Sequence, residues 1–301
     1  MRGRNVFDVE ALRLLDTVAR TGSFTAAAAR LNYTQSAVSR RIAALEHRAG
    51  GPLFERLPRG VRLTPAGEAL HHHARVVLNR LTRAEEELAG IHGGYRGRLR
   101  VGAFATANVA LVPGALRAFR ADFPEVELVP IEGPSGSLLR RMREGGLDVA
   151  VVSDYPSELP REAEEVEMVE LADDELFVAL PRDHRLAAEE IVDLRELREE
   201  TWIEAPPPGR ATALASACAR AGFAPRATVR IGEWTGKFGF VAAGLGVTLV
   251  PAIAAYAVPA DLVLRSLGDL APRRTVYAAL PPAPLPAART LVRLLAGRAG
   301  Q

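Results

Sequence analysis

Residues 34–46, with the sequence TQSAVSRRIAALE, begin with side chains suited to hydrogen bonding with a polyanion. Gln35 and Arg40 carry flat, bidentate groups that match the edges of adenine and guanine, and Arg40 can also bind a phosphate. Ser36 and Ser39 are short enough to allow a close backbone approach, and their hydroxyls can bind phosphate oxygens. The first acidic residue of the segment is its last, Glu46. These residue types predict a surface that lies against DNA.

Three short amphipathic segments must position these side chains. The first is a helix over residues 8–21 that Gly22 ends, and the second is a helix over residues 23–31. Thr34 follows a short break and can cap the third helix, whose other face is apolar. Three helices with a tight break before the last predict a helix-turn-helix, whose last helix enters the major groove of DNA.

A basic hairpin is predicted next to the third helix. The segment PLFERLPRGVRLT contains two short extended pieces around the turn LPRG. Arg59 stands at the tip of the turn, where it can reach into a narrow minor groove, and Arg56 can contact a phosphate. The alternative for both arginines is a solvated surface charge. The predicted DNA-binding residues are Thr34, Gln35, Ser36, Ser39, Arg40, Arg56 and Arg59.

The charge distribution also separates the N-terminal part from the rest. Residues 1–64 hold eleven arginines and five acidic residues, whereas residues 65–301 hold 27 basic and 31 acidic residues. A basic block at one end of a mildly acidic chain predicts a polyanionic partner at that end. Chance clustering of surface charge is the alternative explanation.

A long helix follows over residues 65–92, with Thr64 as its cap and Pro65 in its first turn. Its apolar residues recur in alternating steps of four and three, which is the spacing of a coiled-coil seam. The seam predicts a dimer, although a helix packed on its own domain is an alternative. The predicted dimerisation residues are Leu70, Ala74, Val77, Leu81, Ala84 and Leu88.

Beyond residue 97 the pattern changes to alternating strands and helices, which predicts an α/β domain with a parallel sheet and crossover helices. The composition, 48% hydrophobic and 25% charged, is typical of a globular protein. The N-terminus lacks the pattern of a signal peptide and no apolar run could span a membrane. Cys218 is the single cysteine, so no internal disulfide is possible, and we expect a buried thiol and a cytoplasmic protein.

The sequence does not favour an enzyme. The segment GPSGS lacks the final glycine of a nucleophile elbow, and GLGVTL lacks the third glycine of a dinucleotide-binding loop. Three consecutive histidines, His71–His73, point in different directions on a helix and cannot converge on one metal ion. We therefore expect no catalytic residue, no metal and no cofactor.

Two alternatives remain at this point. One is an α/β enzyme with a nucleic-acid-binding appendage, and the other is a stand-alone solute-binding protein. Salt distinguishes the solute-binding protein from a DNA-binding regulator, because phosphate contacts release counterions and DNA binding weakens steeply as salt rises, whereas small-ligand binding changes far less.

Residues 12–70 resemble the N-terminal domain of LysR-type transcriptional regulators, through the motifs GSF, TQSAVSRRI, LFER and LTPAGE. The later segments FPEVELVPIEG, GGLDVAVV and VAAGLGVTLVP are similar to the effector domain of the same family. The resemblance implies a winged helix-turn-helix (residues 1–64), a linker helix for dimerisation (65–92), and a two-lobed effector domain like that of periplasmic binding proteins (97–301). Lobe I would comprise residues 97–160 and 268–301, and lobe II residues 161–267.

The resemblance also implies an effector site between the lobes. Thr106 follows the first strand, at the expected start of a helix, and Ser135 stands in the matching place after the next strand. By resemblance, these two line the site in lobe I. The corresponding residues of lobe II are Ala205, Pro206, Trp234 and Thr248.

A carboxylated metabolite would suit hydroxyls and helix N-termini, and an aromatic one would suit the flat surface of Trp234. The implied partners are an operator duplex, this small-molecule effector, further copies of the chain in a homodimer or homotetramer, and RNA polymerase. In the implied mechanism the effector shifts the two lobes, and the shift alters DNA bending and contact with the polymerase.

Overall fold

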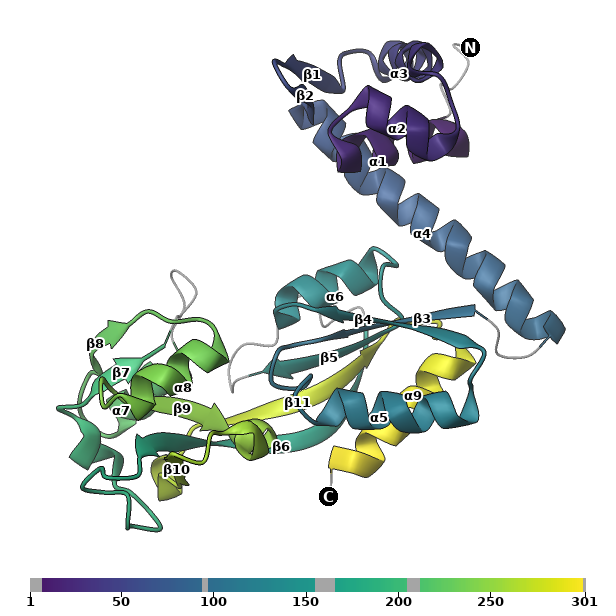
Figure 1. The fold of residues 1–301 in the computed structure, drawn as a ribbon. Coiled ribbons are helices and arrows are strands. Elements are labelled where there is room, and N and C mark those ends of the chain that lie inside the picture. Colours follow the sequence, from purple (N-terminus) through teal and green to yellow (C-terminus); the bar gives the residue numbers. More distant parts are fainter. Residues whose placement is uncertain (1–6, 94–96, 155–165, 205–211, 300–301) are drawn as a thin grey trace. The chain divides into compact units, whose positions relative to one another are not determined.

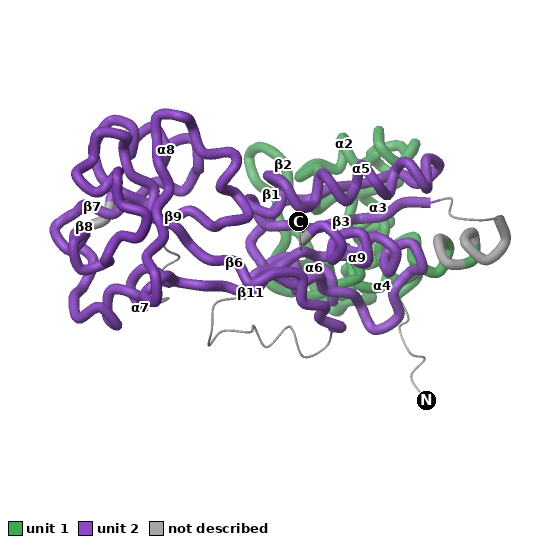
Figure 2. The backbone as a smooth tube through the Cα atoms, turned by 90° about the horizontal axis from the view of Figure 1, so that it is seen from below, with its two compact units in different colours: residues 1–96, 144–146 green, residues 97–143, 147–301 purple. Residues whose placement is uncertain are grey.

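The computed structural model describes residues 7–93, 97–154, 166–204 and 212–299. The chain divides into two compact units (Figure 2). One comprises residues 1–96 together with 144–146, and the other comprises residues 97–143 and 147–301. No helix within the described ranges has both the length and the apolar character that a membrane crossing requires.

Local capping chemistry defines the three N-terminal helices, α1 (Val9–Thr21), α2 (Phe24–Leu31) and α3 (Gln35–Ala49). The Ser23 hydroxyl accepts a hydrogen bond from the Ala26 amide at the start of α2, and the Thr34 hydroxyl accepts one from the Ala37 amide at the start of α3. Gly22 ends α1 with a left-handed backbone, at φ 63°. These helices confirm the helix-turn-helix that the sequence predicts.

The two-stranded hairpin consists of β1 (Phe54–Leu57) and β2 (Gly60–Leu63), which pair in antiparallel fashion. The Val61 amide donates to the Gly22 carbonyl at 2.8 Å, which joins the hairpin to the end of α1. A Cβ atom on Gly60 would lie only 2.4 Å from the Gly22 carbonyl oxygen, so glycine is required for this approach. The hairpin is the predicted wing, and the long helix α4 (Pro65–Gly93) follows it.

One hydrophobic core holds the N-terminal helices together. It combines Leu12, Leu15 and Val18 of α1 with Ala27 and Ala28 of α2, and Val38, Ile42 and Leu45 of α3. Leu53 and Phe54 close it from the hairpin side, and Ala74 of α4 is also fully buried there. Because this core occupies one side of α3, the other side of that helix is left at the surface.

The second unit is built on a mixed sheet with strand order β10-β6-β11-β5-β3-β4, and β9 pairs with β6 (Figure 1). The strands are β3 (Gly97–Ala103), β4 (Val126–Glu132), β5 (Val149–Asp154), β6 (Glu167–Pro181), β9 (Thr248–Pro251), β10 (Leu262–Arg265) and β11 (Arg273–Leu280). Strands β3, β4 and β5 run parallel to one another, whereas the pairings of β11 and β6 are antiparallel. The expectation of a parallel sheet was therefore wrong for its second half.

The long strand β6 belongs to both halves of this unit. Residues 167–175 pair with β11, and residues 176–181 pair with β9 and β10. A strand shared in this way replaces a crossover helix, which explains why the alternating pattern did not indicate the antiparallel pairing. The two-lobed α/β architecture itself is as predicted.

Both faces of the sheet are covered in the half that contains β5 (Figure 1). Val149 and Val151 pack with α5 (Leu111–Asp122) and α9 (Pro286–Ala299), while Ala150 and Val152 pack with α6 (Ser135–Arg143). This alternation accounts for the continuous apolar run in the sequence of β5.

The other half repeats the arrangement with α7 (Ala213–Arg220) on one face of the sheet and α8 (Trp234–Ala242) on the other. Cys218 lies on α7 and is fully buried, as expected, and burial raises the pKa of its thiol to about 11. A separate pair of parallel strands, β7 (Thr201–Ile203) and β8 (Arg226–Val229), lies in the same half. Short 3-10 turns connect the remaining strands: η2 (Leu194–Leu197), η3 (Ala252–Ala257) and η4 (Gly268–Leu270).

Candidate nucleic-acid interface and effector site

The polar side of α3 is at the surface, as the sequence predicts. Gln35, Ser36 and Arg40 are exposed, whereas Ser39 is half-buried. Within the part of the chain that the structure describes, the side chains of Gln35 and Arg40 form no hydrogen bond or ion pair. A helix whose amide and guanidinium groups have no internal partners can bind an external one at little cost in lost contacts.

Thr34, one of the predicted DNA-binding residues, serves as the N-terminal cap of α3. The Thr34 hydroxyl lies 3.2 Å from the Ala37 amide nitrogen and 3.1 Å from the Ser36 hydroxyl. Thr34 thus orients the first turn of α3 and the Ser36 side chain. A contact of Thr34 itself with DNA stays a prediction.

The first acidic residue of α3 points away from the polar side. One carboxylate oxygen of Glu46 accepts hydrogen bonds from the amides of Leu53 and Phe54, at 2.9 and 3.1 Å. The carboxylate therefore fixes the base of the wing to the end of α3. It adds no negative charge to the surface formed by the first turns of the helix.

Two arginines of the wing are available for an external partner. Arg56 and Arg59 are exposed and form no ion pair among the described residues. Arg62 differs, because its guanidinium binds the Glu55 carboxylate at 2.7 Å. The wing therefore presents Arg56 and Arg59, the two residues selected from the sequence.

Three side chains at the edge of α3 form a cluster that was not predicted from the sequence. The Tyr33 hydroxyl donates a hydrogen bond to the Glu10 carboxylate, Arg41 pairs with the same carboxylate at 2.6 Å, and the guanidinium of Arg41 lies 4.7 Å from the Tyr33 ring centroid. No local sequence pattern connects Tyr33 or Arg41 with Glu10, because Glu10 lies on a different helix, α1.

The apolar seam of α4 is split in the structure. Ala74 has no exposed surface and Leu70 packs against the same core, so these two contact their own domain. Val77, Leu81 and Leu88 are 42%, 37% and 56% exposed, and Ala84 is exposed as well. The alternative of packing on the same domain therefore holds for the first part of the seam, and only the later part is available to a partner.

The histidines of α4 are not uniformly solvated. His71 is half-buried and lies 2.9 Å from the Asp16 carboxylate, which fixes the start of α4 against α1. Among the described residues, no group of three or more His, Cys, Asp or Glu side chains gathers as a metal site would require.

Thr106 lies in the turn that follows β3 and not at a helix start. Residues 105–110 form turns and α5 begins only at Leu111, so that expectation was wrong. Thr106 is only 3% exposed, and its hydroxyl accepts a hydrogen bond from the Arg274 guanidinium at 2.8 Å. The hydroxyl is therefore committed to a buried internal partner.

Arg274 is the centre of a buried polar network. Its guanidinium donates to the Asp174 carboxylate at 2.9 Å and lies 4.8 Å from the Phe104 ring centroid. The second oxygen of Asp174 accepts a hydrogen bond from the Ile253 amide. The network connects β6, β11 and the turn that follows β3, and sequence reasoning missed both charged members because they are 100 residues apart.

Ser135 begins α6 and is half-buried. Its hydroxyl accepts a hydrogen bond from the Ser153 amide at 3.0 Å, which brings the end of β5 next to the start of α6. Gly133, two residues earlier, donates its amide to the carbonyl of Ala103, the last residue of β3. Thr106 and Ser135 thus lie at the carboxyl ends of neighbouring parallel strands, where ligands bind in α/β sheets.

The lobe II residues have different environments. Thr248 is 1% exposed and its hydroxyl donates to the Ile203 carbonyl at 2.7 Å, which is a structural bond between β9 and β7. Trp234 is half-buried at the first turn of α8, where the Lys237 ammonium lies 4.5 Å from its ring centroid. Ala205 and Pro206 lie outside the described residues.

Two half-buried charged side chains, Glu204 and Lys237, influence each other, and Lys237 is the one that contacts Trp234. Burial raises the pKa of Glu204, and the Thr212 hydrogen bond and nearby Lys237 only partly oppose that effect. Burial also lowers the pKa of Lys237, the single lysine of the chain. Such perturbed groups are typical of ligand sites, although structural ion pairs show the same behaviour.

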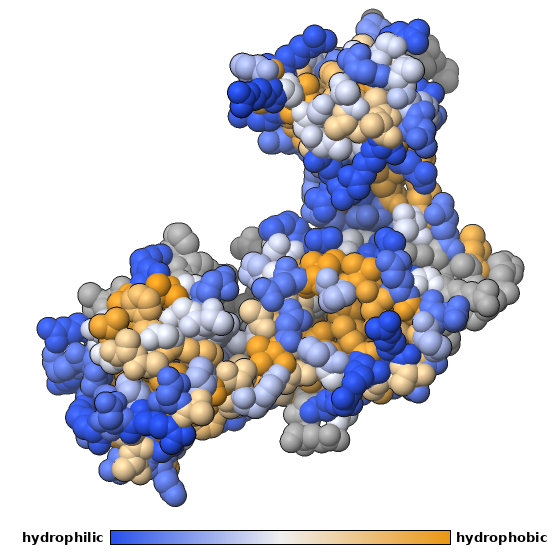
Figure 3. Space-filling model, viewed as in Figure 1, coloured by the Kyte–Doolittle hydropathy of each residue, from blue (hydrophilic) through white to orange (hydrophobic). Residues whose placement is uncertain are grey.

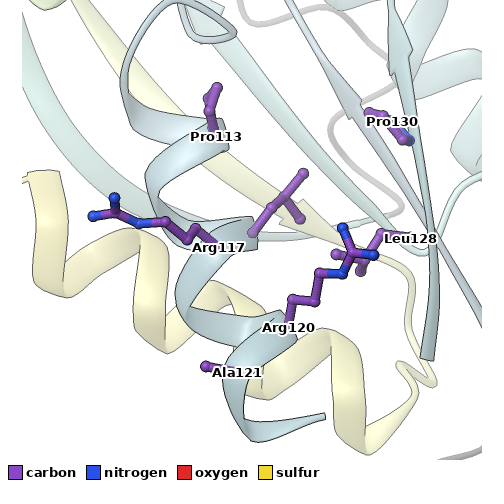
Figure 4. Close-up of a pocket in the computed structure, with 7 residues that line it drawn as sticks. Pro113, Arg117, Arg120, Ala121, Leu128 and Pro130 are labelled. Atoms are coloured by element: carbon purple, nitrogen blue, oxygen red, sulfur yellow. The ribbon is translucent and has the colours of Figure 1, made fainter. Parts of the chain in front are cut away.

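A separate hollow of about 550 Å³ lies on lobe I. It is lined by α5 and by the edge strand β4, and Figure 4 shows Arg120 extending from α5 towards Leu128 of β4. Figure 3 shows a hydrophobic area over the same elements. None of the predicted effector residues lines this hollow: the lining residues are Pro113, Leu116, Arg117, Arg120, Ala121, Leu128 and Pro130.

Family models match the N-terminal domain and the effector domain of this chain, and relatives match most of its length. Residues 9–68 match the bacterial regulatory helix-turn-helix protein model of the lysR family, and residues 92–300 match the LysR substrate binding domain. YybE of Bacillus subtilis, an uncharacterized HTH-type transcriptional regulator, is 31% identical over 80% of this chain and 82% of its own length. The transcriptional regulator CfxR of Cupriavidus necator is 33% identical over 79% of this chain and 74% of its own length.

Solved structures share the architecture. A full-length OxyR variant from Pseudomonas aeruginosa is 26% identical, with a TM-score of 0.71 over 96% of this chain and 95% of that one. The LysR family regulator CbnR is 23% identical, with a TM-score of 0.74 over 98% of this chain and 100% of that one. Together with the matches to both domain models, these relatives show that the chain belongs to the LysR family of transcriptional regulators, with a DNA-binding helix-turn-helix and an effector-binding domain.

Proposed function

We propose that this chain binds an operator as a homodimer or homotetramer and changes transcription when a small molecule occupies the crevice of its effector domain. One observation carries the DNA-binding part of the proposal. The exposed side of α3 carries Gln35 and Arg40, which have no side-chain partner among the described residues. The buried residues of the same helix are all apolar. The adjoining wing adds Arg56 and Arg59.

In the proposed complex, α3 enters the major groove, with Gln35 and Arg40 at base edges and Ser36 and Ser39 near phosphates. Full-length CbnR, which shares this fold with a TM-score of 0.75, has been solved in complex with its target DNA, which supports DNA binding by this fold. Thr34 orients the first turn of α3, Arg56 contacts phosphate, and Arg59 reaches the minor groove.

Self-association is proposed through the later part of α4. Val77, Leu81, Ala84 and Leu88 are exposed apolar side chains at coiled-coil spacing. Burying a leucine of this kind against a second copy of α4 contributes about 1.5–3 kcal/mol. A dimer built in this way presents two copies of α3 to two half-sites of an imperfectly palindromic operator.

The proposed effector is a carboxylated or aromatic metabolite. The lobe I side of the crevice consists of Ser135 and the turn around Thr106. The lobe II side consists of Trp234 and Thr248, together with Ala205 and Pro206 by family resemblance. Because the hydroxyls of Thr106 and Thr248 are already bonded internally, we assign them to shaping the crevice, and we assign ligand contact to Ser135 and Trp234. Effector binding then shifts the lobes, and the oligomer transmits the shift to DNA and RNA polymerase.

The test begins by selecting bound duplexes from a random-sequence pool with the full-length chain. Fluorescence anisotropy on the selected duplex then compares Arg40→Ala with Arg13→Ala, which removes another exposed arginine of the same domain. Loss of a bidentate base contact costs about 1–3 kcal/mol, so we expect Arg40→Ala to weaken binding about tenfold to a hundredfold. Arg13→Ala should leave it within about threefold, because surface charges away from an interface contribute little.

Two results would refute the DNA-binding proposal. The chain would select no sequence from the pool, or Arg40→Ala and Arg13→Ala would bind the selected duplex equally well. The first result would exclude sequence-specific DNA binding, and the second would place the interface away from Arg40 and the polar side of α3.

A further inference from the structure

Tyr33, Glu10 and Arg41 form an exposed cluster on one flank of α3. Glu10 lies in the first turn of α1, and its carboxylate receives both the Tyr33 hydroxyl and the Arg41 guanidinium. The guanidinium also stacks on the Tyr33 ring at 4.7 Å. Hydrogen bonding by Tyr33 and the charge of Arg41 lower the pKa of Glu10, so the carboxylate is ionised at neutral pH. The positive charge of Arg41 is therefore neutralised in place.

The core keeps this acid beside α3. Ala11 and Leu12, which follow Glu10 on α1, are buried in the same cluster as Val38 and Ile42 of α3. The first turn of α1 therefore lies along one flank of α3. Asp8, just before that turn, pairs in the same way with Arg48 at 2.9 Å.

The three arginines of α3 consequently fall into two groups. Arg41 and Arg48 lie on the α1 flank and are paired with Glu10 and Asp8. Arg40 lies on the polar side, next to Ser36, and forms no ion pair in the described part of the chain. Because exposed ion pairs add little to stability, these two acids are better explained by what they do to the surface potential.

We propose that Glu10 is a specificity-determining residue, which neutralises Arg41 and so keeps duplex DNA from docking on the α1 flank of α3. The inference rests on the DNA-binding function proposed above. Operator binding uses the polar side of α3, where base contacts fix the orientation, and leaves the flank unused. Sequence-independent binding has no such constraint and depends on phosphate contacts alone, so an uncompensated Arg41 would add a second way to dock.

The experiment compares Glu10→Gln with the unmodified full-length chain on two duplexes, the selected operator and a mixed-sequence duplex that lacks it. Anisotropy titrations at several salt concentrations give the affinity and the salt slope for each. We expect the mixed-sequence duplex to bind about three- to tenfold more tightly at low salt, with a slope larger by about one, because one more phosphate is neutralised. Operator affinity should change less than about twofold, and thermal unfolding should not change.

Two further variants isolate the cause. Arg41→Gln in the Glu10→Gln background should restore the original affinity and slope for the mixed-sequence duplex. Glu127→Gln removes another exposed carboxylate that is paired with an arginine, Arg98, at 3.0 Å in the other unit. This control makes the same change in net charge and should alter neither affinity.

Several outcomes would overturn the inference. Unchanged binding of Glu10→Gln to the mixed-sequence duplex would show that Glu10 does not restrain Arg41. An equal increase in the affinity of Glu10→Gln for both duplexes would place Arg41 inside the operator interface. A decrease in its affinity for the operator would make Glu10 a positioning residue. If the unmodified chain bound no duplex at all, the proposed DNA-binding function would fail, and this inference with it.

Discussion

The polar side of α3 and the proposed effector crevice both contain polar side chains, but in opposite circumstances. On α3, Gln35 and Arg40 are exposed and without side-chain partners in the described part of the chain. In the crevice region, the hydroxyls of Thr106 and Thr248 are buried and already bonded, to Arg274 and to the Ile203 carbonyl. Polar side chains are therefore available to an external partner in one region and are committed to internal structure in the other.

This difference shows what residue type alone can establish. A polar residue on the outer side of a short capped helix has few internal groups within reach, so it is more often left to solvent or to a partner. A polar residue at the end of a sheet strand is surrounded by other segments, and any of them can satisfy it. Substitutions in the two regions should therefore separate stability from binding.

The largest expected effect is on the buried network. Arg274→Met would leave the Asp174 carboxylate, which is 3% exposed, without its charged partner. We expect the effector domain to lose about 3–5 kcal/mol of unfolding free energy, because an unpaired buried charge is not solvated. Both tryptophans of the chain, Trp202 and Trp234, lie in this unit, so urea titration followed by tryptophan fluorescence reports on it.

The neighbouring arginine provides the control for this prediction. Arg273 pairs with Asp173 at the surface, at 2.8 Å, and the two side chains are 49% and 54% exposed. Arg273→Met should cost less than about 1 kcal/mol, as exposed ion pairs do. Equal losses for the two variants would contradict the importance assigned to burial.

The second prediction concerns the exposed part of the α4 seam. Leu81→Arg would place a charge where a second copy of α4 is proposed to pack, and should raise the dimer dissociation constant at least about tenfold. Thr82→Arg makes the same change in charge one position along the helix and should leave the dimer intact. Sedimentation velocity over a dilution series measures both constants, and equal constants would exclude this stripe from the interface.

Sequence reasoning succeeded where structure is decided locally. Thr34 could be recognised as a cap and Gly22 as a helix end, because each effect acts within one turn of the helix. The solvent-exposed side of α3 followed directly from the positions of Val38, Ile42 and Leu45. The helices and wing of the N-terminal domain could therefore be derived almost completely from their residues.

Sequence reasoning failed where distant segments meet. The antiparallel pairing of β6 and the bond between Arg274 and Asp174 depend on residues about 100 positions apart, and no local pattern indicates them. Ala74 shows the same limit: its spacing fits a dimer seam, but the core of its own domain buries it. The contact between Glu10 and Arg41 likewise arises from helix packing, which periodicity alone does not specify.

The third prediction compares hydroxyls in the two regions. Thr248→Val keeps the shape of the side chain but removes the hydrogen bond to the Ile203 carbonyl, and should destabilise the effector domain by about 1 kcal/mol. Ser36→Ala on α3 should leave stability nearly unchanged and weaken operator binding instead. Urea titration and anisotropy on both variants test the pair. If Thr248→Val were as stable as the unmodified chain, the structural role assigned to its hydroxyl would be wrong.

The smallest expected effect is on the wing. Arg59→Ala and Arg56→Ala should each reduce the salt slope of DNA binding by about one, because each removes one interaction with the negatively charged duplex. Arg62 serves as the control, because its guanidinium already binds Glu55 at 2.7 Å, and Arg62→Ala should reduce the slope less. If Arg59 enters the minor groove, its loss should weaken binding most on duplexes with A·T tracts, where the groove is narrow, whereas loss of Arg56 should weaken all duplexes alike. Identical sequence dependence for the two variants would assign both arginines to the phosphate backbone, and the wing would then add affinity without adding sequence preference.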